Sequence, residues 1–140
     1  MAEPRDLDLR SERRPDIEVT LGAESFHIDV SIKHPLAPTY AGKDPEVVVR
    51  RAEASKEQKY GEVAREAGAA FIPFIMTTYG GVGAKALAFV AKIIKRGQEV
   101  APCPLLTKRR LILGLQGALM KGNYRCLTSG RARASRATRP

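Results

Sequence analysis

The chain has few of the features that mark membrane, secreted or zinc-binding proteins. Its two cysteines, Cys103 and Cys126, are too few for a four-ligand zinc site, and their spacing matches no paired-cysteine motif. The longest apolar run, at 69–76, is shorter than the roughly 18 residues that span a bilayer, and Pro73 interrupts it. We therefore expect no membrane span, and free thiols in a reducing compartment.

The first 14 residues carry four arginines and four acidic residues and have no apolar core. Signal peptides need such a core, and both signal and transit peptides avoid acids. We therefore expect an intracellular protein, nuclear or cytoplasmic. The length of 140 residues, with 44% hydrophobic and 28% charged residues, is typical of one folded domain.

Positive charge is concentrated near the C-terminus. The net charge is +9, and five arginines without any acid lie in 122–140, so residues 1–121 hold only +4. The small and polar residues between those arginines offer little to bury, which predicts a disordered basic tail over 123–140. Such a tail attracts polyanions in general.

Polar and apolar residues alternate over 16–21 and again over 26–33, which predicts a β-hairpin. Asp44 followed by Pro45 predicts a helix start, because the carboxylate can accept hydrogen bonds from free N–H groups and proline fixes φ in the first turn. This helix should end near Ala67.

Three further elements complete the expected fold. They are an apolar strand at 71–78, a helix at 82–95, and a helix at 105–121 that Gly122-Asn123 should close. The apolar strand should pack on both faces, while Pro73 favours an edge or a bulge. The order hairpin, helix, strand, helix, helix predicts a small mixed α/β fold.

The polar face of the predicted hairpin gathers three carboxylates. A turn centred on Ala23-Glu24 would place Asp29 opposite Glu18 and Ser31 opposite Asp16. Like charges across strands destabilise a sheet, and a divalent cation such as Mg²⁺ would compensate them. A solvated hairpin face also carries acids for solubility alone, and the hairpin residues by themselves favour that interpretation over a metal site.

Lysines interrupt the expected buried stripe of the first helix. The stripe is Val49, Ala52, Lys56, Lys59 or Tyr60, Val63 and Ala67. The two lysines could extend to water along the seam margin, or reach the sheet. Near a bound metal, a lysine could stabilise the negative charge that builds on a phosphate during cleavage.

Three motifs in order carry a resemblance to a known family. They are Arg14-Pro15-Asp16, then after twelve residues Asp29-Val30-Ser31, then Lys56-Glu57-Gln58-Lys59-Tyr60. This series resembles the restriction-like endonuclease domain that follows the reverse transcriptase of certain non-LTR retrotransposons, a branch of the PD-(D/E)xK nuclease superfamily. Glu3-Pro4-Arg5 and 71–80 also resemble strands of that domain, so the resemblance covers roughly 3–95.

The resemblance implies roles for particular residues. Asp16 and Asp29 would be catalytic carboxylates that bind Mg²⁺ (or Mn²⁺), with Glu18 as a further candidate ligand. Lys56 or Lys59 would be the catalytic lysine and Tyr60 a supporting residue. Candidate contacts to nucleic acid are Arg14, Lys33, Arg125, Arg131 and Arg133.

Two departures from the family pattern affect these expectations. Ser31 stands where the superfamily has a lysine, so activity depends on the helix lysine or on Lys33. The family's first helix and strand have no counterpart, which predicts a truncated restriction-endonuclease-like core at 15–122 after a polar lead-in at 1–14. The chain would then be a fragment of a longer element protein.

The implied function is DNA cleavage that provides a 3′-hydroxyl for target-primed reverse transcription. The implied partners are DNA and, through a missing reverse transcriptase region, element RNA. The alternative is a catalytically dead remnant that binds nucleic acid through its basic residues. A third interpretation is a globular stub with no function of its own.

Overall fold

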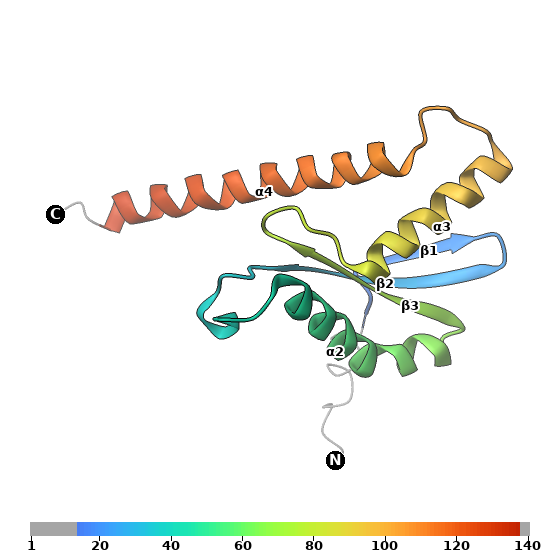
Figure 1. The fold of residues 1–140 in the computed structure, drawn as a ribbon, viewed down its shortest axis with the longest axis horizontal. Coiled ribbons are helices and arrows are strands. Elements are labelled where there is room, and N and C mark those ends of the chain that lie inside the picture. Colours follow the sequence, from blue (N-terminus) through green and yellow to red (C-terminus); the bar gives the residue numbers. More distant parts are fainter. Residues whose placement is uncertain (1–13, 138–140) are drawn as a thin grey trace, which may run out of the picture.

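The computed structural model describes residues 14–137, and side chains as far as residue 130. The fold is mixed α/β, as predicted (Figure 1). Its elements are β1 (Ile17–Leu21), β2 (Glu24–Lys33), a short 3-10 helix (Pro38–Tyr40), α2 (Pro45–Glu66), β3 (Ala69–Thr77), α3 (Ala84–Val100) and α4 (Lys108–Ala137). The strand order is β1-β2-β3, with β1 antiparallel and β3 parallel to β2.

The hairpin forms, but its predicted register is wrong by two residues. A two-residue turn at Gly22-Ala23 joins the strands, and Gly22 adopts a φ of 66° that suits glycine in such a turn. Glu18 consequently pairs with His27 rather than with Asp29. Because side chains alternate with a period of two, the polar and apolar faces are those predicted.

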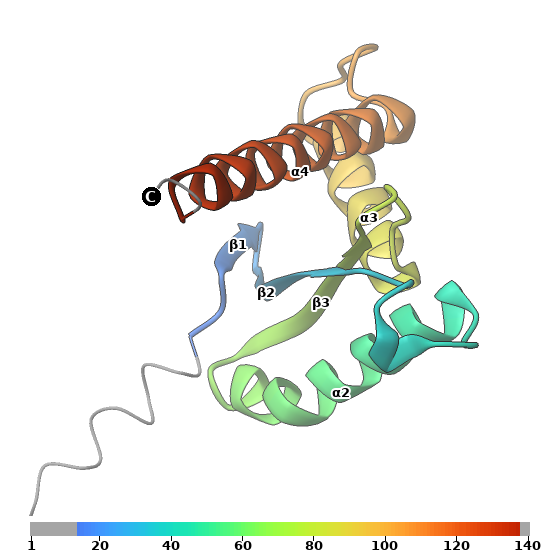
Figure 2. The same ribbon diagram turned by 90° about the vertical axis from the view of Figure 1, so that its left-hand side faces the viewer.

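Helices cover both faces of the sheet (Figure 2). Helix α2 lies on one side, and α3 and α4 lie on the other. The apolar face of β2 packs against α3, where the rings of Phe26 and Phe89 are 5.2 Å apart. The core on this side consists of Phe26, Ile28, Phe74, Met76, Ala86, Phe89 and Val90. Helix α2 covers the opposite face, to which Asp29 points.

Strand β3 combines both properties expected from its sequence. It is an edge strand of the described sheet, as Pro73 indicated, and helices cover both of its faces. Pro73 is nevertheless buried and pairs with Asp29 in the parallel register. An edge position tolerates the missing N–H of proline.

The start of α2 is confirmed, whereas its buried face differs from the prediction. Asp44 Oδ1 accepts a hydrogen bond of 2.7 Å from the N–H of Glu46. The buried residues of α2 are Val48, Glu53 and Ala64, and Ala67 is exposed beyond the helix. Helix α3 is also longer than predicted and buries Ala86, Phe89 and Val90.

The predicted helix stop at Gly122-Asn123 is wrong. Helix α4 continues to Ala137, so 123–137 is helical where a disordered tail was expected. Contacts with the loop after β3 hold this helix, because Gln116 and Asn123 donate hydrogen bonds of 2.8 and 2.9 Å to the carbonyls of Gly80 and Thr78.

The proposed domain limits at 1–14, 15–122 and 123–140 stay predictions. Residues 1–13 and 138–140 lie outside the described residues, as do the side chains of Arg131 and Arg133. Across 14–137, no helix is both long and apolar enough to cross a membrane.

Candidate active site

Asp29 and Lys56 meet between β2 and α2. The Nζ of Lys56 lies 2.5 Å from Oδ2 of Asp29, and the two side chains are 24% and 14% exposed. Asp29 comes from the middle of β2, on the face that α2 covers, and Lys56 comes from the middle of α2. Lys56 therefore reaches the sheet instead of extending along the helix margin to water.

The buried oxygen of Asp29 is the one that Lys56 approaches. Oδ2 of Asp29 is buried, and the Lys56 ammonium is its charge partner. A buried carboxylate oxygen normally needs such a partner. Lys56 therefore supplies the countercharge that this position of Asp29 requires.

Asp16 directly precedes β1 and is held beside the strand residue that follows Asp29. Its Oδ2 accepts a hydrogen bond of 2.7 Å from the N–H of Val30, the residue that follows Asp29. Extending the observed register by one step beyond the Ile17–Ile28 pair also places Asp16 across from Asp29. The observed register therefore places Asp16 next to Asp29, and these are the two acids to which the family resemblance gives catalytic roles.

Glu18 lies two pairs further along the hairpin, opposite His27, and is exposed. Within 14–130, the side chains of His, Cys, Asp and Glu form no group of three or more that could hold a metal ion. The structure therefore brings Asp16 and Asp29 to one place and leaves Glu18 at the neighbouring position.

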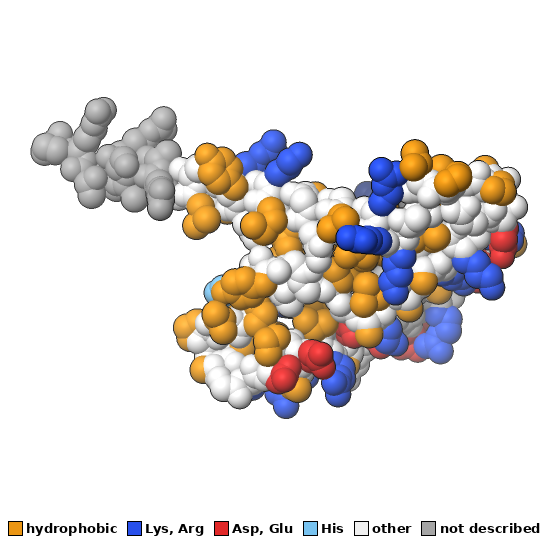
Figure 3. Space-filling view, turned by 45° about the horizontal axis from the view of Figure 1, so that its top comes forward, with side chains coloured by type: hydrophobic (Ala, Val, Ile, Leu, Met, Phe, Trp, Pro, Cys, Tyr) orange, Lys and Arg blue, Asp and Glu red, His pale blue; other side chains and the backbone are white. Residues whose placement is uncertain are grey.

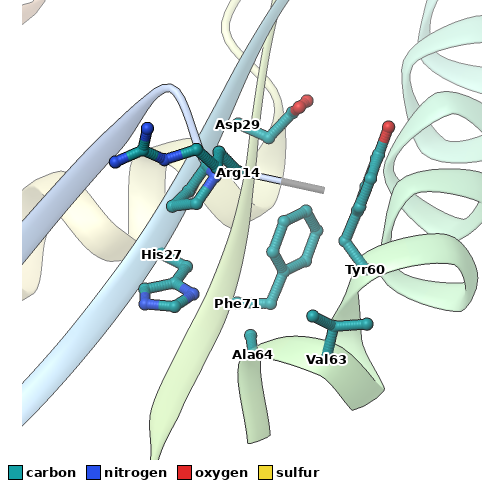
Figure 4. A pocket seen from close by; sticks show the side chains of 8 residues that line it. Arg14, His27, Asp29, Tyr60, Val63, Ala64 and Phe71 are labelled. Carbon is teal, nitrogen blue, oxygen red and sulfur yellow. The ribbon is translucent and has the colours of Figure 1, made fainter. Parts of the chain in front are cut away.

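Tyr60 connects the two lysines with the sheet. Its ring lies 5.7 Å from the ring of Phe71, and the Nζ atoms of Lys56 and Lys59 lie 5.6 and 4.9 Å from its centroid. A pocket beside Asp29 is lined by these two rings and by Arg14, Pro15, His27, Val63 and Ala64. In Figure 4 the Asp29 carboxylate and the Tyr60 hydroxyl point to the same side of this pocket, while the Arg14 guanidinium points away.

The candidate nucleic-acid contacts divide between the two sides of the sheet. Arg14 lines the pocket beside Asp29, and Lys33 projects from the same face of β2, four residues further along. Arg125 lies on α4, which packs on the opposite side. The sequence alone did not indicate that these basic residues lie on two different sides of the sheet.

A second charged group, Glu53, Glu57 and Lys85, connects α2 with α3, and the sequence patterns did not predict it. Glu53 is only 5% exposed, and its Oε1 accepts a 3.0 Å hydrogen bond from the N–H of Lys85 at the start of α3. The Lys85 ammonium lies 2.8 Å from Glu57, and this hydrogen bond and charge, with a smaller contribution from Glu53, raise the pKa of Lys85. One signal was present, because Gly83 precedes α3 and offers no capping side chain.

Glu53 lies at the N-terminus of α3, where its carboxylate accepts from the N–H of Lys85. Negative charge is favourable at a helix N-terminus, which explains the burial of Glu53.

Comparison with known proteins identifies one relative by sequence. No family model and no solved structure matches the chain. It is 28% identical over 142 aligned positions to the retrotransposable element SLACS 132 kDa protein of Trypanosoma brucei gambiense. The match covers 94% of this chain and 12% of that protein. This similarity supports a retrotransposon origin, and the chain corresponds to only a small part of its relative.

Proposed function

We propose that this chain is a metal-dependent DNA endonuclease domain derived from a retrotransposon reverse transcriptase protein. The observation that carries the proposal is the contact between Asp29 and Lys56 beside Asp16. Two carboxylates and an ammonium at one place are what hydrolysis of a phosphodiester by a metal-activated water requires. The similarity to a retrotransposable element protein supports the retrotransposon origin in this proposal.

The donor set fits Mg²⁺ or Mn²⁺. Mg²⁺ is usually bound by one or two carboxylates together with waters and substrate phosphates. Asp29 and Asp16 supply two carboxylates, and an ion that they bound would share Asp29 with the Lys56 ammonium. The ion would supply an activated water and stabilise developing negative charge.

The chain's own residues would then position the substrate and stabilise charge. In the structure, Lys56 pairs with Asp29. A phosphate oxygen placed beside that carboxylate would lie within reach of the same ammonium. The ring of Tyr60 restricts both lysines from one side. Arg14 and Lys33 lie on the same face of the sheet and could contact the DNA backbone.

The arrangement of the elements also supports the proposal. A hairpin followed by a helix and a strand parallel to the second hairpin strand is compatible with a truncated restriction-endonuclease-like core. DNA is the proposed substrate, and the 3′-hydroxyl at the nick could prime reverse transcription. Element RNA is a proposed partner through a longer protein, and the proposed location is nuclear or cytoplasmic.

Nicking of supercoiled plasmid DNA in Mg²⁺ tests this proposal. We expect relaxed circles from the unaltered chain, and loss of nicking in Asp29→Asn and on addition of EDTA. Glu62→Gln is the control, since it removes an acid that is 77% exposed and pairs with Arg65. Nicking that persists in Asp29→Asn would overturn the assignment.

A catalytically dead nucleic-acid-binding remnant is the second candidate, and the excess of basic residues in α4 favours it. It predicts DNA binding that weakens with salt and is indifferent to EDTA, with no nicking by any variant.

A further inference from the structure

The net charge of the whole chain is carried by its last segment. Residues 1–99 contain 15 basic and 15 acidic residues, whereas 100–140 contain nine basic residues and no acid, which accounts for the net charge of +9. Five of those nine lie on the part of α4 whose side chains are described: Lys108, Arg109, Arg110, Lys121 and Arg125. A helix with bases and no acids along its length has charge complementarity only with an anionic partner.

This helix and the candidate active site face opposite sides of the molecule. Asp29 and Lys56 lie between the sheet and α2, while α4 packs on the other side with α3 (Figures 1 and 2). The sheet itself separates them. A DNA strand held at Asp29 therefore does not occupy the outward surface of α4.

The outward surface of α4 combines bases with exposed apolar side chains. Leu111, Ile112, Leu115 and Leu119 pack toward the core. At about 100° per residue, Arg110, Leu113, Lys121 and Tyr124 fall on the opposite third of the helix circumference, and Arg125 lies beside that third. Leu113 and Tyr124 are 56% and 69% exposed. Figure 3 shows hydrophobic and basic side chains next to one another along this helix.

The position of Tyr124 favours a nucleic acid over other anions. Its ring is exposed and lies between Lys121 and Arg125 in sequence, one turn or less from each. An exposed aromatic ring between cationic side chains stacks on an unpaired base while the cations contact phosphates. An amphipathic membrane helix would instead present a continuous apolar face, which Arg110 and Lys121 interrupt here.

We propose that the outward face of α4, defined by Arg110, Leu113, Lys121, Tyr124 and Arg125, binds single-stranded nucleic acid. This surface is separate from the cleavage site and does not depend on cleavage. It would hold a strand on the far side of the sheet from the DNA segment presented to Asp29.

Fluorescence anisotropy with a labelled 20-nucleotide single strand of mixed sequence, in a series of KCl concentrations, tests the proposal. The variants are Tyr124→Leu, Tyr124→Phe and the triple change Arg110→Gln, Lys121→Gln, Arg125→Gln in the full chain. The control removes the same number of bases from the other side of the sheet, with Lys43→Gln, Arg50→Gln and Arg51→Gln. Circular dichroism of every variant checks that the helices remain formed.

The triple change should reduce the slope of log K against log salt concentration by about 2, since each lost contact to a single strand contributes roughly 0.7. Tyr124→Leu should weaken binding roughly 5- to 100-fold, whereas Tyr124→Phe keeps the stacking ring and most of the affinity. The α2-side control should change the slope by much less. Asp29→Asn should bind the single strand like the unaltered chain, whether or not that variant nicks plasmid.

Several results would overturn the inference. One is an unchanged salt slope in the α4 triple variant, and another is an equal loss in the α2-side control. Equal affinities of Tyr124→Leu and Tyr124→Phe would exclude base stacking. Stronger binding to phosphatidylserine vesicles than to the single strand, with the same dependence on α4, would identify a lipid surface instead.

Discussion

Asp29 and Lys56 form an ion pair, and removing one partner should lower the free energy of unfolding by a different amount from removing the other. Lys56→Met removes the ammonium and leaves the Asp29 carboxylate, which is 14% exposed, without its countercharge. Removing one partner of a fully buried pair costs about 3–5 kcal/mol. Both groups here keep some solvent contact, so we expect Lys56→Met to lower the free energy of unfolding by about 2 kcal/mol.

Asp29→Asn should cost less, because the Lys56 side chain that remains is 24% exposed and long enough to move its ammonium into water. We expect a loss of less than about 1 kcal/mol. In the double variant the two losses should not add, since the partners are in direct contact. The coupling energy between the two positions should therefore be favourable and of about 1 kcal/mol.

Urea denaturation of the four proteins at pH 7 measures these free energies, and the Lys56→Met loss corresponds to a fall in Tm of roughly 4–8 °C. Arg65→Met is the control, because the ion pair of Arg65 with Glu62 is 3.7 Å long and both side chains are 77% exposed. Its effect should be near zero. If Lys56→Met cost no more than Arg65→Met, the two charges would not be coupled as the structure indicates.

Two further predictions concern α2 and its contacts with the start of α3. Glu57→Gln should lower stability slightly near neutral pH, by no more than about 0.5 kcal/mol for so exposed a pair. Because Glu57 raises the pKa of Lys85 above 10.5, this difference should persist below that pH and disappear as the pH rises through the folded-state pKa; a difference that grows at high pH would contradict it. Gly83→Ala should destabilise the chain by about 2 kcal/mol or more, since the new Cβ would meet Oε1 of Glu53 and backbone at Ile75. Gly61→Ala should instead stabilise it by roughly 0.5–1 kcal/mol, because nothing lies within 4 Å of the added carbon, and urea denaturation that ranked the two variants in the opposite order would refute this packing.

Local signals predicted much of the fold. Alternation of polar and apolar residues identified both hairpin strands, and Asp44 followed by Pro45 identified the start of α2. Each of these signals acts within a few residues, through side-chain periodicity or hydrogen bonding to nearby amides. Predicting which acids face each other requires the exact position of the turn. The observed turn lies one residue earlier than the predicted one, which replaces Glu18 by Asp16 as the residue across from Asp29.

Contacts between distant segments could not be predicted in the same way. Burial of Glu53 depends on the start of α3 lying across from α2, a tertiary arrangement that no local pattern encodes. Asn123, at the predicted stop, instead donates a hydrogen bond to the carbonyl of Thr78 in the loop after β3, and α4 continues past it. In both cases tertiary contacts outweighed local propensity.

The measurement that tests the account most directly compares plasmid nicking by Lys56→Ala and Lys59→Ala in Mg²⁺. The Nζ of Lys56 contacts Asp29, whereas that of Lys59 lies over the Tyr60 ring. We predict that Lys56→Ala lowers the nicking rate by about 100-fold or more, the usual effect of removing a group that stabilises the transition state, and that Lys59→Ala lowers it by less than about tenfold. A Lys56→Ala variant that nicks as fast as the unaltered chain would contradict the central claim.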